Sequence, residues 1–336
     1  MKLKFIAAAG VLALVTAGAS AQNINGAGAT FPNPIYSKWF SEYSQQHPSV
    51  KINYQPIGSG GGIRQVTEGT VDFGASDVTM TDQQIAVAKV KVLALPTVLG
   101  AVVPVYNLPG ISKELNFSGD VIADIYLGKI SKWNDGRIAK DNPGVSLPDH
   151  AILPVYRSDG SGTSFIFTDF LSKVSPAWNS GPGRGAAINW PSGIGQKGNE
   201  GIAGMVRQAP FSFGYVELIY AVQNKMSYGV VKNAAGKYVK ASTDSVTAAA
   251  AGAAKSMPAD YRISITNAPG ADAYPISSFT WLLIPTHSAD AAKTKALTDF
   301  MGWMLDHGQS EAASLSYAPL PKTVQDMVRK SIGTIK

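Results

Sequence analysis

Alternation of apolar, strand-like runs with segments of helical periodicity most constrains how this chain can fold. The expected strands are residues 50–57, 71–75, 92–106, 152–156 and 278–285, and the expected helices are residues 34–46, 61–68, 119–127, 163–174, 245–256 and 289–307. This alternation predicts an α/β architecture, and 336 residues suffice for two α/β lobes. The Gly- and Pro-rich stretch 179–195 is expected to be a surface loop.

The amino-terminal end has the three-part pattern of a secretory signal. Lys2 and Lys4 precede an apolar stretch, residues 5–15, and small residues follow up to Ala21. This order predicts a signal peptide over residues 1–21 that is cleaved after Ala21. The alternative is a membrane anchor, but the apolar stretch is short and rich in Ala and Gly for a spanning helix.

Cysteine is absent from the sequence. This absence limits both the compartment that we expect for the protein and the kinds of chemical site that it can contain. Disulfides, thiolate metal sites, cysteine nucleophiles and a lipid-modified amino-terminal Cys are excluded, so a free periplasmic protein is the expected product. The formal charge falls from +6 to +4 on cleavage, because Lys2 and Lys4 leave and residues 1–21 hold no acid. Lys and Arg are spread along the chain, and no tract typical of nucleic-acid binding is present.

Three turns share a design in which glycine and a hydroxyl residue lead into an expected helix. They are residues 26–32, 58–62 and 159–164. A Ser or Thr at a helix N-cap leaves backbone N–H groups pointing outward with partial positive charge, and glycine lets an anion approach the backbone closely. One such turn usually only caps its helix, whereas three in one chain indicate an anion site.

Two charged residues lie at the ends of expected strands. Arg157 follows residues 152–156, where its guanidinium can bind two oxygens of a tetrahedral anion. The alternative is a pair with Asp159, and both contacts are compatible. Asp77 could accept a hydrogen bond from a protonated anion, which a fully ionised sulfate cannot offer. The alternative for Asp77 is the N-cap of a helix over residues 79–85.

The sequence lacks the patterns of a hydrolase, a nucleotide-binding loop and a histidine metal site. The glycine-rich turns lack the features of a nucleophile elbow and of a P-loop. The four histidines, His47, His150, His287 and His307, show no metal-ligand spacing. We therefore expect no catalytic residue, metal or cofactor.

Four motifs in order resemble the periplasmic phosphate-binding proteins of phosphate ABC transporters. They are GAGATFP (residues 26–32), GSGGG (58–62), VDFGASD (71–77) and DGSGTS (159–164). DIYLGKI-x-KW (124–133) and GNEGIA (198–203) look like further landmarks of that family. The resemblance spans nearly the whole chain after residue 21.

This resemblance implies a two-lobed type II periplasmic binding protein fold with a ligand cleft at the hinge. Lobe I would comprise residues 22–104 and 278–336, and lobe II residues 105–277. The implied function is high-affinity capture of inorganic phosphate and its delivery to the membrane permease and ATPase subunits of an importer. The protein would be a monomer without enzymatic activity.

The resemblance also implies a set of phosphate ligands on residues already singled out. Thr30 and Phe31 would give backbone N–H groups, with Ala29 beside them, and Asp77 would accept the phosphate proton. The remaining ligands would be Ser59, Arg157, Ser161, Gly162 and Thr163. A protein for sulfate, a phosphate-ester hydrolase and a secreted structural protein are the competing hypotheses.

Overall fold

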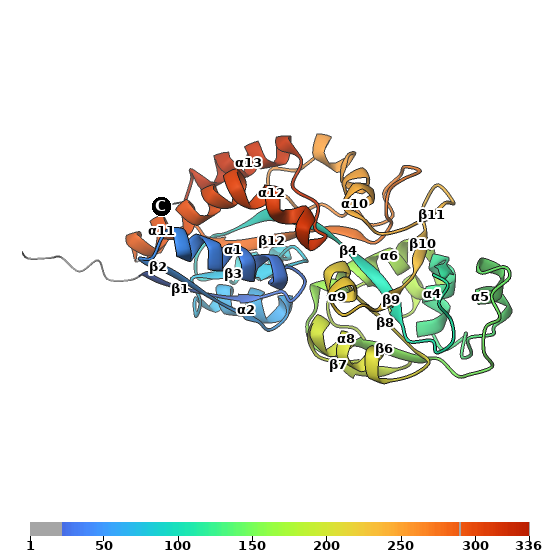
Figure 1. The fold of residues 1–336 in the computed structure, drawn as a ribbon. Coiled ribbons are helices and arrows are strands. Elements are labelled where there is room, and N and C mark those ends of the chain that lie inside the picture. The colour runs from blue at the N-terminus through green and yellow to red at the C-terminus, as the bar shows by residue number, and fades with distance from the viewer. Residues whose placement is uncertain (1–21, 289, 336) are drawn as a thin grey trace, which may run out of the picture.

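A computed structural model describes residues 22–288 and 290–335, and it has an α/β architecture with two lobes side by side (Figure 1). The expected signal peptide lies outside the described residues. One lobe contains β1 (Gln22–Gly28), β2 (Val50–Pro56), β3 (Phe73–Ser76) and β12 (Ser277–Pro285). The other contains β6 (Leu153–Arg157), β7 (Ile194–Gln196), β8 (Ser212–Glu217) and β9 (Ser227–Tyr228). We call them the β1–β3 lobe and the β6–β8 lobe.

A single long strand, β4 (Val92–Tyr106), connects the two lobes. Residues 92–101 pair with β12, and residues 102–106 pair with β8, so the sheet order is β2-β1-β3-β12-β4-β8-β6-β7 with β9 also on β4. Pro96 lies next to a register shift in the pairing with β12, where a proline, which cannot donate to the ladder, is tolerated. The predicted lobe division at residue 104 falls within β4 and stays a prediction.

Helices cover both lobes. In the β1–β3 lobe they are α1 (Asn33–Gln46), α2 (Ser59–Glu68), α3 (Asp82–Ala86), α11 (Ala291–Trp303), α12 (Gln309–Glu311) and α13 (Lys322–Ile332). In the β6–β8 lobe they are α4 (Gly119–Tyr126), α5 (Gly136–Asp141), α6 (Gly162–Val174), α7 (Pro176–Ser180), α8 (Gly198–Gln208) and α9 (Leu218–Gln223). None of the helices that the structure describes is long and apolar enough to span a bilayer.

The helix α10 (Thr243–Ala250) contacts β12 of the β1–β3 lobe and β4, the strand that connects the two lobes. Before α10, the chain passes through a small sheet of the β6–β8 lobe. This sheet is formed by β5 (Asn116–Phe117), β10 (Val230–Lys232) and β11 (Tyr238–Val239). Tyr261 Oη then lies 2.7 Å from Ser331 Oγ on α13, in the β1–β3 lobe. The helix expected over residues 245–256 is thus α10 followed by a separate 3₁₀ turn, Ala253–Lys255.

In helix α1, the spacing of the apolar residues in the sequence determines which face of the helix is buried. Its buried side chains are Ile35, Tyr36, Trp39, Phe40 and Tyr43, which recur at the spacing of one helix face. The last expected helix, residues 289–307, begins as α11 and continues as a π-helical turn, Met304–Gly308. Trp39 Nε1 donates to the Gly308 carbonyl at 3.1 Å, so α1 is tied to this turn.

The carboxyl ends of the parallel strands lead into the glycine-rich turns. β1 pairs in parallel with β2 and β3, while β6 pairs in parallel with β7 and β8. In open α/β sheets, ligands bind outside these carboxyl ends. The topology therefore brings the turns after β1, β3 and β6 towards one place between the lobes.

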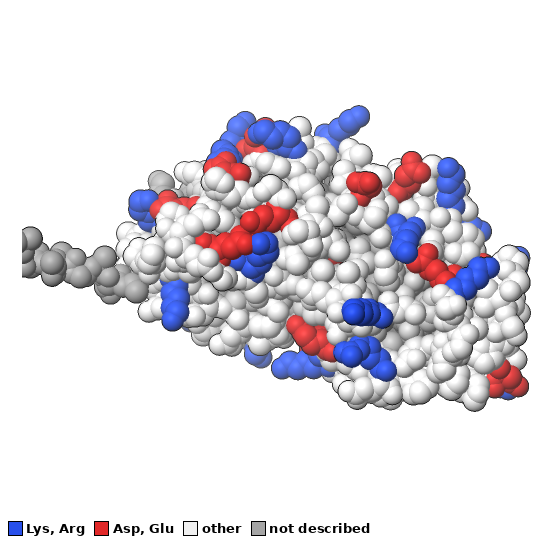
Figure 2. Space-filling model, in the orientation of Figure 1, with Lys and Arg blue, Asp and Glu red and all other residues white. Residues whose placement is uncertain are grey.

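The charged side chains on the surface do not gather in one place. On the face drawn in Figure 2, basic and acidic side chains occur in small mixed groups over both lobes. The mild basic excess of the sequence is therefore spread out on that face rather than concentrated.

Candidate functional site

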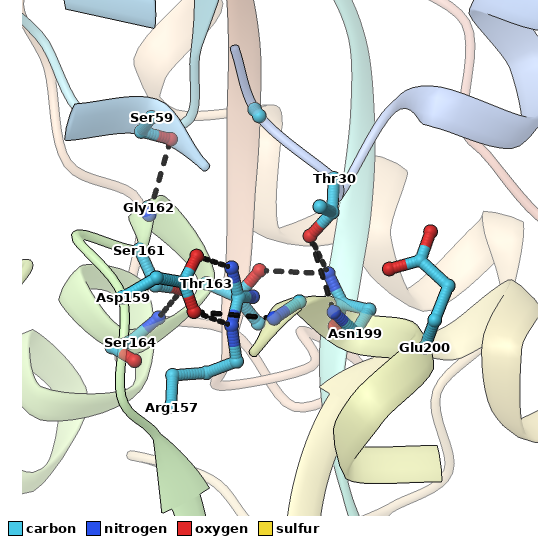
Figure 3. A network of polar contacts seen from close by, with 12 residues as sticks. Thr30, Ser59, Arg157, Asp159, Ser161, Gly162, Thr163, Ser164, Asn199 and Glu200 are labelled. Atoms are coloured by element: carbon cyan, nitrogen blue, oxygen red, sulfur yellow. Dashed lines mark hydrogen bonds and ion pairs between the residues drawn. The ribbon is translucent and has the colours of Figure 1, made fainter. Parts of the chain in front are cut away.

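Residues from five segments meet in a buried cluster between the two lobes (Figure 3). Thr30 and Asp77 follow β1 and β3, Ser59 begins α2, Arg157 ends β6, and Ser161, Gly162 and Thr163 form the start of α6. Each of these side chains is at most 3% exposed. Burial of this many polar groups is costly unless they bind each other or a ligand.

The prediction that each turn presents a hydroxyl N-cap is wrong for two of the three turns. Only Ser161 caps its helix, accepting from Ser164 N at 3.0 Å. The N-cap of α1 is Pro32, and that of α2 is Gly58, whose φ of +94° requires glycine. The hydroxyls of Thr30 and Ser59 are thus free of capping and contact other residues of the cluster.

Several backbone N–H groups of the cluster donate to no protein acceptor within residues 22–288 and 290–335. They belong to Thr30, Phe31, Ser59 and Thr163. The backbone N–H groups of two other predicted ligands already have protein acceptors. Ala29 N donates to Ala75 O at 3.0 Å, and Ser161 N donates to Ala186 O at 2.9 Å. Ala29 therefore flanks the site without a free donor, and Ser161 can offer its hydroxyl only.

Arg157 is held rigidly by the carboxylate two residues later. Its Nε donates to Asp159 Oδ1 at 2.7 Å and its Nη2 to Asp159 Oδ2 at 2.6 Å, with the Arg157 side chain 1% exposed. Nη1 is buried and has no partner among the described residues. Burial raises the pKa of Asp159, but the Arg157 hydrogen bonds and charge outweigh it and hold that pKa below its ordinary value. Arg157 thus keeps one charged donor group for a ligand.

Asp77 is the acidic member of the cluster. It accepts from Thr280 Oγ1 at 2.7 Å, so the alternative reading as a helix N-cap is wrong; the N-cap of α3 is Thr81. Burial raises the pKa of Asp77 to about 7, against the lowering effect of the Thr280 hydrogen bond, the Arg157 charge and the Ser59 hydroxyl. At neutral pH this carboxyl can therefore either accept or donate a proton.

The two lobes touch directly at this cluster. Gly60 N donates to Gly160 O at 2.9 Å, and Gly162 N donates to Ser59 Oγ at 3.1 Å. A Cβ on Gly162 would lie 2.5 Å from Ser59 Oγ and 2.6 Å from Asp77 Oδ2, so only glycine fits while the lobes are closed.

We expect Gly162→Ala to weaken anion binding about ten- to a hundredfold, because relief of the clash requires the lobes to separate. The thermal midpoint should be unchanged or higher, since Ala favours a helix. Titration calorimetry and thermal unfolding measure the two effects. Gly136→Ala is the matched control: Gly136 also begins a helix of the same lobe, and a Cβ there meets nothing within 4 Å. Equal binding by both variants would contradict the closed arrangement.

Comparisons with known proteins agree with the motifs. The sequence model of the PBP superfamily domain matches residues 15–307. The phosphate-binding protein PstS of Xylella fastidiosa strain Temecula1 is 48% identical over 299 residues, which cover 89% of this chain and 81% of that protein. The Pasteurella multocida PstS is 46% identical over 305 residues, covering 90% and 88%. The chain belongs to the PstS family of phosphate-binding proteins.

The predicted two-lobed fold of this PstS-family protein is also confirmed. The crystal structure of a phosphate-binding protein from Stenotrophomonas maltophilia aligns with a TM-score of 0.70 at 20% identity, covering 92% of this chain and 94% of that one. At this identity the likeness concerns the fold. Within the described residues, no three His, Asp or Glu side chains gather in a way that could hold a metal ion.

Sequence reasoning missed the residues that support the PstS-family site. Thr280 lies in an expected strand, and its hydroxyl in an otherwise apolar run, residues 279–285, was the available signal. Asn199 lies within GNEGIA, to which the resemblance assigns no role, and it donates to both Thr30 and Thr163. Tyr215 had no signal: its Oη contacts Ser164 Oγ at 2.6 Å and accepts from Arg157 N at 3.1 Å only because β8 lies beside β6.

Proposed function

We propose that this protein binds one inorganic phosphate ion between its lobes. The observation that carries the proposal is the composition of the buried cluster: hydrogen-bond donors from both lobes lie together with the Asp77 carboxyl, while the Asp159 carboxylate is paired with Arg157. A tetrahedral anion that carries one proton matches this set, because its unprotonated oxygens accept and its hydroxyl donates.

Each site residue has a proposed role. Thr30, Phe31, Ser59 and Thr163 supply backbone N–H groups, and the buried Nη1 of Arg157 supplies a charged donor. The Thr30, Ser59, Ser161 and Thr163 hydroxyls and the Gly162 N–H complete the donor set. Gly162 N reaches the ligand by a small shift from its present bond to Ser59 Oγ.

The membership in the PstS family supports a wider role for this site. We propose that the chain is exported, cleaved after Ala21 and works in the periplasm as a monomer without enzymatic activity. The closed form, with residues 22–104 and 278–336 against residues 105–277, would hand phosphate to the permease and ATPase subunits of an ABC importer. Closure around the ligand is the signal that such a transporter can recognise.

Thermal unfolding of the dialysed mature protein with different anions tests the proposal. A ligand at a hundred times its Kd stabilises the folded state by about 2.7 kcal/mol, so phosphate should raise the midpoint clearly. Sulfate at the same concentration should raise it much less at pH 8, and a bulky phosphate monoester should not raise it, because the residues of the site are buried between the lobes. Equal stabilisation by the three anions, or none by phosphate, would contradict the proposal.

A further inference from the structure

Asn199 is a fully buried side chain that joins three parts of the site (Figure 3). It lies in the first turn of α8, after Gly198, whose φ of +72° sets the turn. Its Nδ2 donates to Thr30 Oγ1 at 2.8 Å and to Thr163 Oγ1 at 3.2 Å. Its backbone N–H also donates to Thr30 Oγ1, at 3.2 Å. Asn199 therefore connects the β1–β3 lobe with α6 of the other lobe.

The backbone of β8 fixes the orientation of the Asn199 amide. Glu217 N donates to Asn199 Oδ1 at 3.0 Å, so this oxygen must face β8. The amide nitrogen, with its two hydrogens, must then face the two threonines, because a flipped amide would place two donors against each other. All polar groups of the Asn199 side chain are satisfied in this one arrangement.

This arrangement determines whether the Thr30 hydroxyl donates a hydrogen bond to a ligand or accepts one from it. A hydroxyl oxygen has two lone pairs and one hydrogen. Both lone pairs of Thr30 Oγ1 are occupied by Asn199 donors, so the hydroxyl can only donate, and its hydrogen is free for an anion oxygen. Thr163 has one lone pair occupied in the same way.

The lone pairs of the Ser59 hydroxyl are also occupied, but by donors other than Asn199. Its Oγ accepts from Asp77 N and from Gly162 N, each at 3.1 Å, so the hydroxyl can only donate, and in this structure it donates to Asp77 Oδ2 at 3.4 Å. Backbone N–H groups set the Ser59 hydroxyl, whereas the Thr30 hydroxyl depends on Asn199.

We propose that Asn199 is a positioning residue that orients the Thr30 hydroxyl as an obligate donor to the bound anion, and the Thr163 hydroxyl in part, and so contributes to the affinity for that anion. This inference rests on the proposed phosphate function. Asn199 acts through the two threonines and needs no contact with the ligand.

The test is a double-mutant cycle on phosphate affinity, measured by titration calorimetry on Asn199→Ala, Thr30→Val and the double variant. A hydrogen bond to a charged group contributes enough that each single change should weaken binding about tenfold or more. In the Thr30→Val background, Asn199→Ala should cost at least fivefold less than in the wild type, because the hydroxyl that it orients is gone. Asn199→Asp, which replaces the Nδ2 donor by a carboxylate oxygen that can only accept, should weaken binding at least a hundredfold.

Asn142→Ala is the control, since Asn142 is 3% exposed and binds backbone through both amide atoms away from the site. It should lower the thermal midpoint with phosphate affinity unchanged. Equal losses from Asn199→Ala in both backgrounds, or an Asn199→Asp protein that binds within threefold of the wild type, would overturn the positioning role. A wild-type protein that does not bind phosphate would overturn the proposed function itself, so the two failures are distinguishable.

Discussion

Arg157→Met is expected to weaken phosphate binding by about a thousandfold or more, roughly 4 kcal/mol. Arg157 is the one Lys or Arg side chain buried among the described residues, and its Nη1 has no protein partner there. The substitution removes that charged donor and also leaves Asp159 as an uncompensated carboxylate that repels the anion. Titration calorimetry measures the loss, and adding Asp159→Asn should recover part of it by removing the repulsion.

The chain contains a matched control for this change. Arg137 pairs with Asp135 through the same two-residue spacing and the same two-pronged geometry, with Nε and Nη2 each 2.9 Å from a carboxylate oxygen. Its side chain is 45% exposed, so Arg137→Met should leave phosphate affinity unchanged. An Arg157→Met protein that binds phosphate within tenfold of the wild type would show that Arg157 is structural.

Asp77→Asn is expected to reduce the preference for phosphate over sulfate by at least tenfold. An amide can accept the phosphate hydrogen through Oδ1 and can donate to sulfate through Nδ2, so the variant loses the repulsion that excludes sulfate. In the wild type, sulfate should bind only when Asp77 is protonated. With its pKa raised to about 7, sulfate affinity should fall about tenfold per pH unit above 7 and level off below it.

The same group should affect the stability of the ligand-free protein. Because the folded-state pKa of Asp77 is raised, the folded form keeps a proton that the unfolded chain releases near pH 4. The free energy of unfolding should therefore decrease as pH rises from about 4 to above 7, and Asp77→Asn should remove this contribution.

Asp169→Asn serves as the control: Asp169 is also buried, but the Thr266 and Ser264 hydroxyls and Lys173 outweigh burial and lower its pKa. The Asp169 contribution is lost as pH falls, so its slope has the opposite sign. Denaturant unfolding across this pH range measures the slopes of both variants relative to the wild type.

A sulfate affinity independent of pH and of Asp77 would contradict the assigned acceptor role.

Many of the strands and helices could be predicted from the sequence, but α13 was missed although its buried Val324 and Val328 recur at helical spacing. The run from Val92 to Tyr106 is entirely apolar apart from one Thr, one Gly, two prolines and its terminal Tyr, and it is one strand. α8 was not predicted because three glycines fall among its first seven residues, and β8 was not predicted although strands of similar length were. Their identity depends on contacts with β4 and β6, which are distant in sequence.

The positively and negatively charged members of the site were predictable as candidates because their residue types are unusual at strand ends. Arg157 and Asp77 stand out in apolar surroundings, and glycine marks the turns beside them. The hydrogen-bond partners could not be predicted, since Asn199 reaches Thr30 across 169 residues and Thr280 reaches Asp77 across 203. Only the arrangement of the two lobes determines such pairs, and it also engages Ala29 N with a strand carbonyl.

Calorimetric titration of the dialysed mature protein with phosphate and then with sulfate, at pH 8, tests the central claim most directly. We predict one phosphate per chain with a Kd of about a micromolar or lower, and sulfate weaker by about a hundredfold or more, which corresponds to about 2.7 kcal/mol. Sulfate binding as tight as phosphate would contradict the role of Asp77. Absence of binding by either anion would contradict the anion site as a whole.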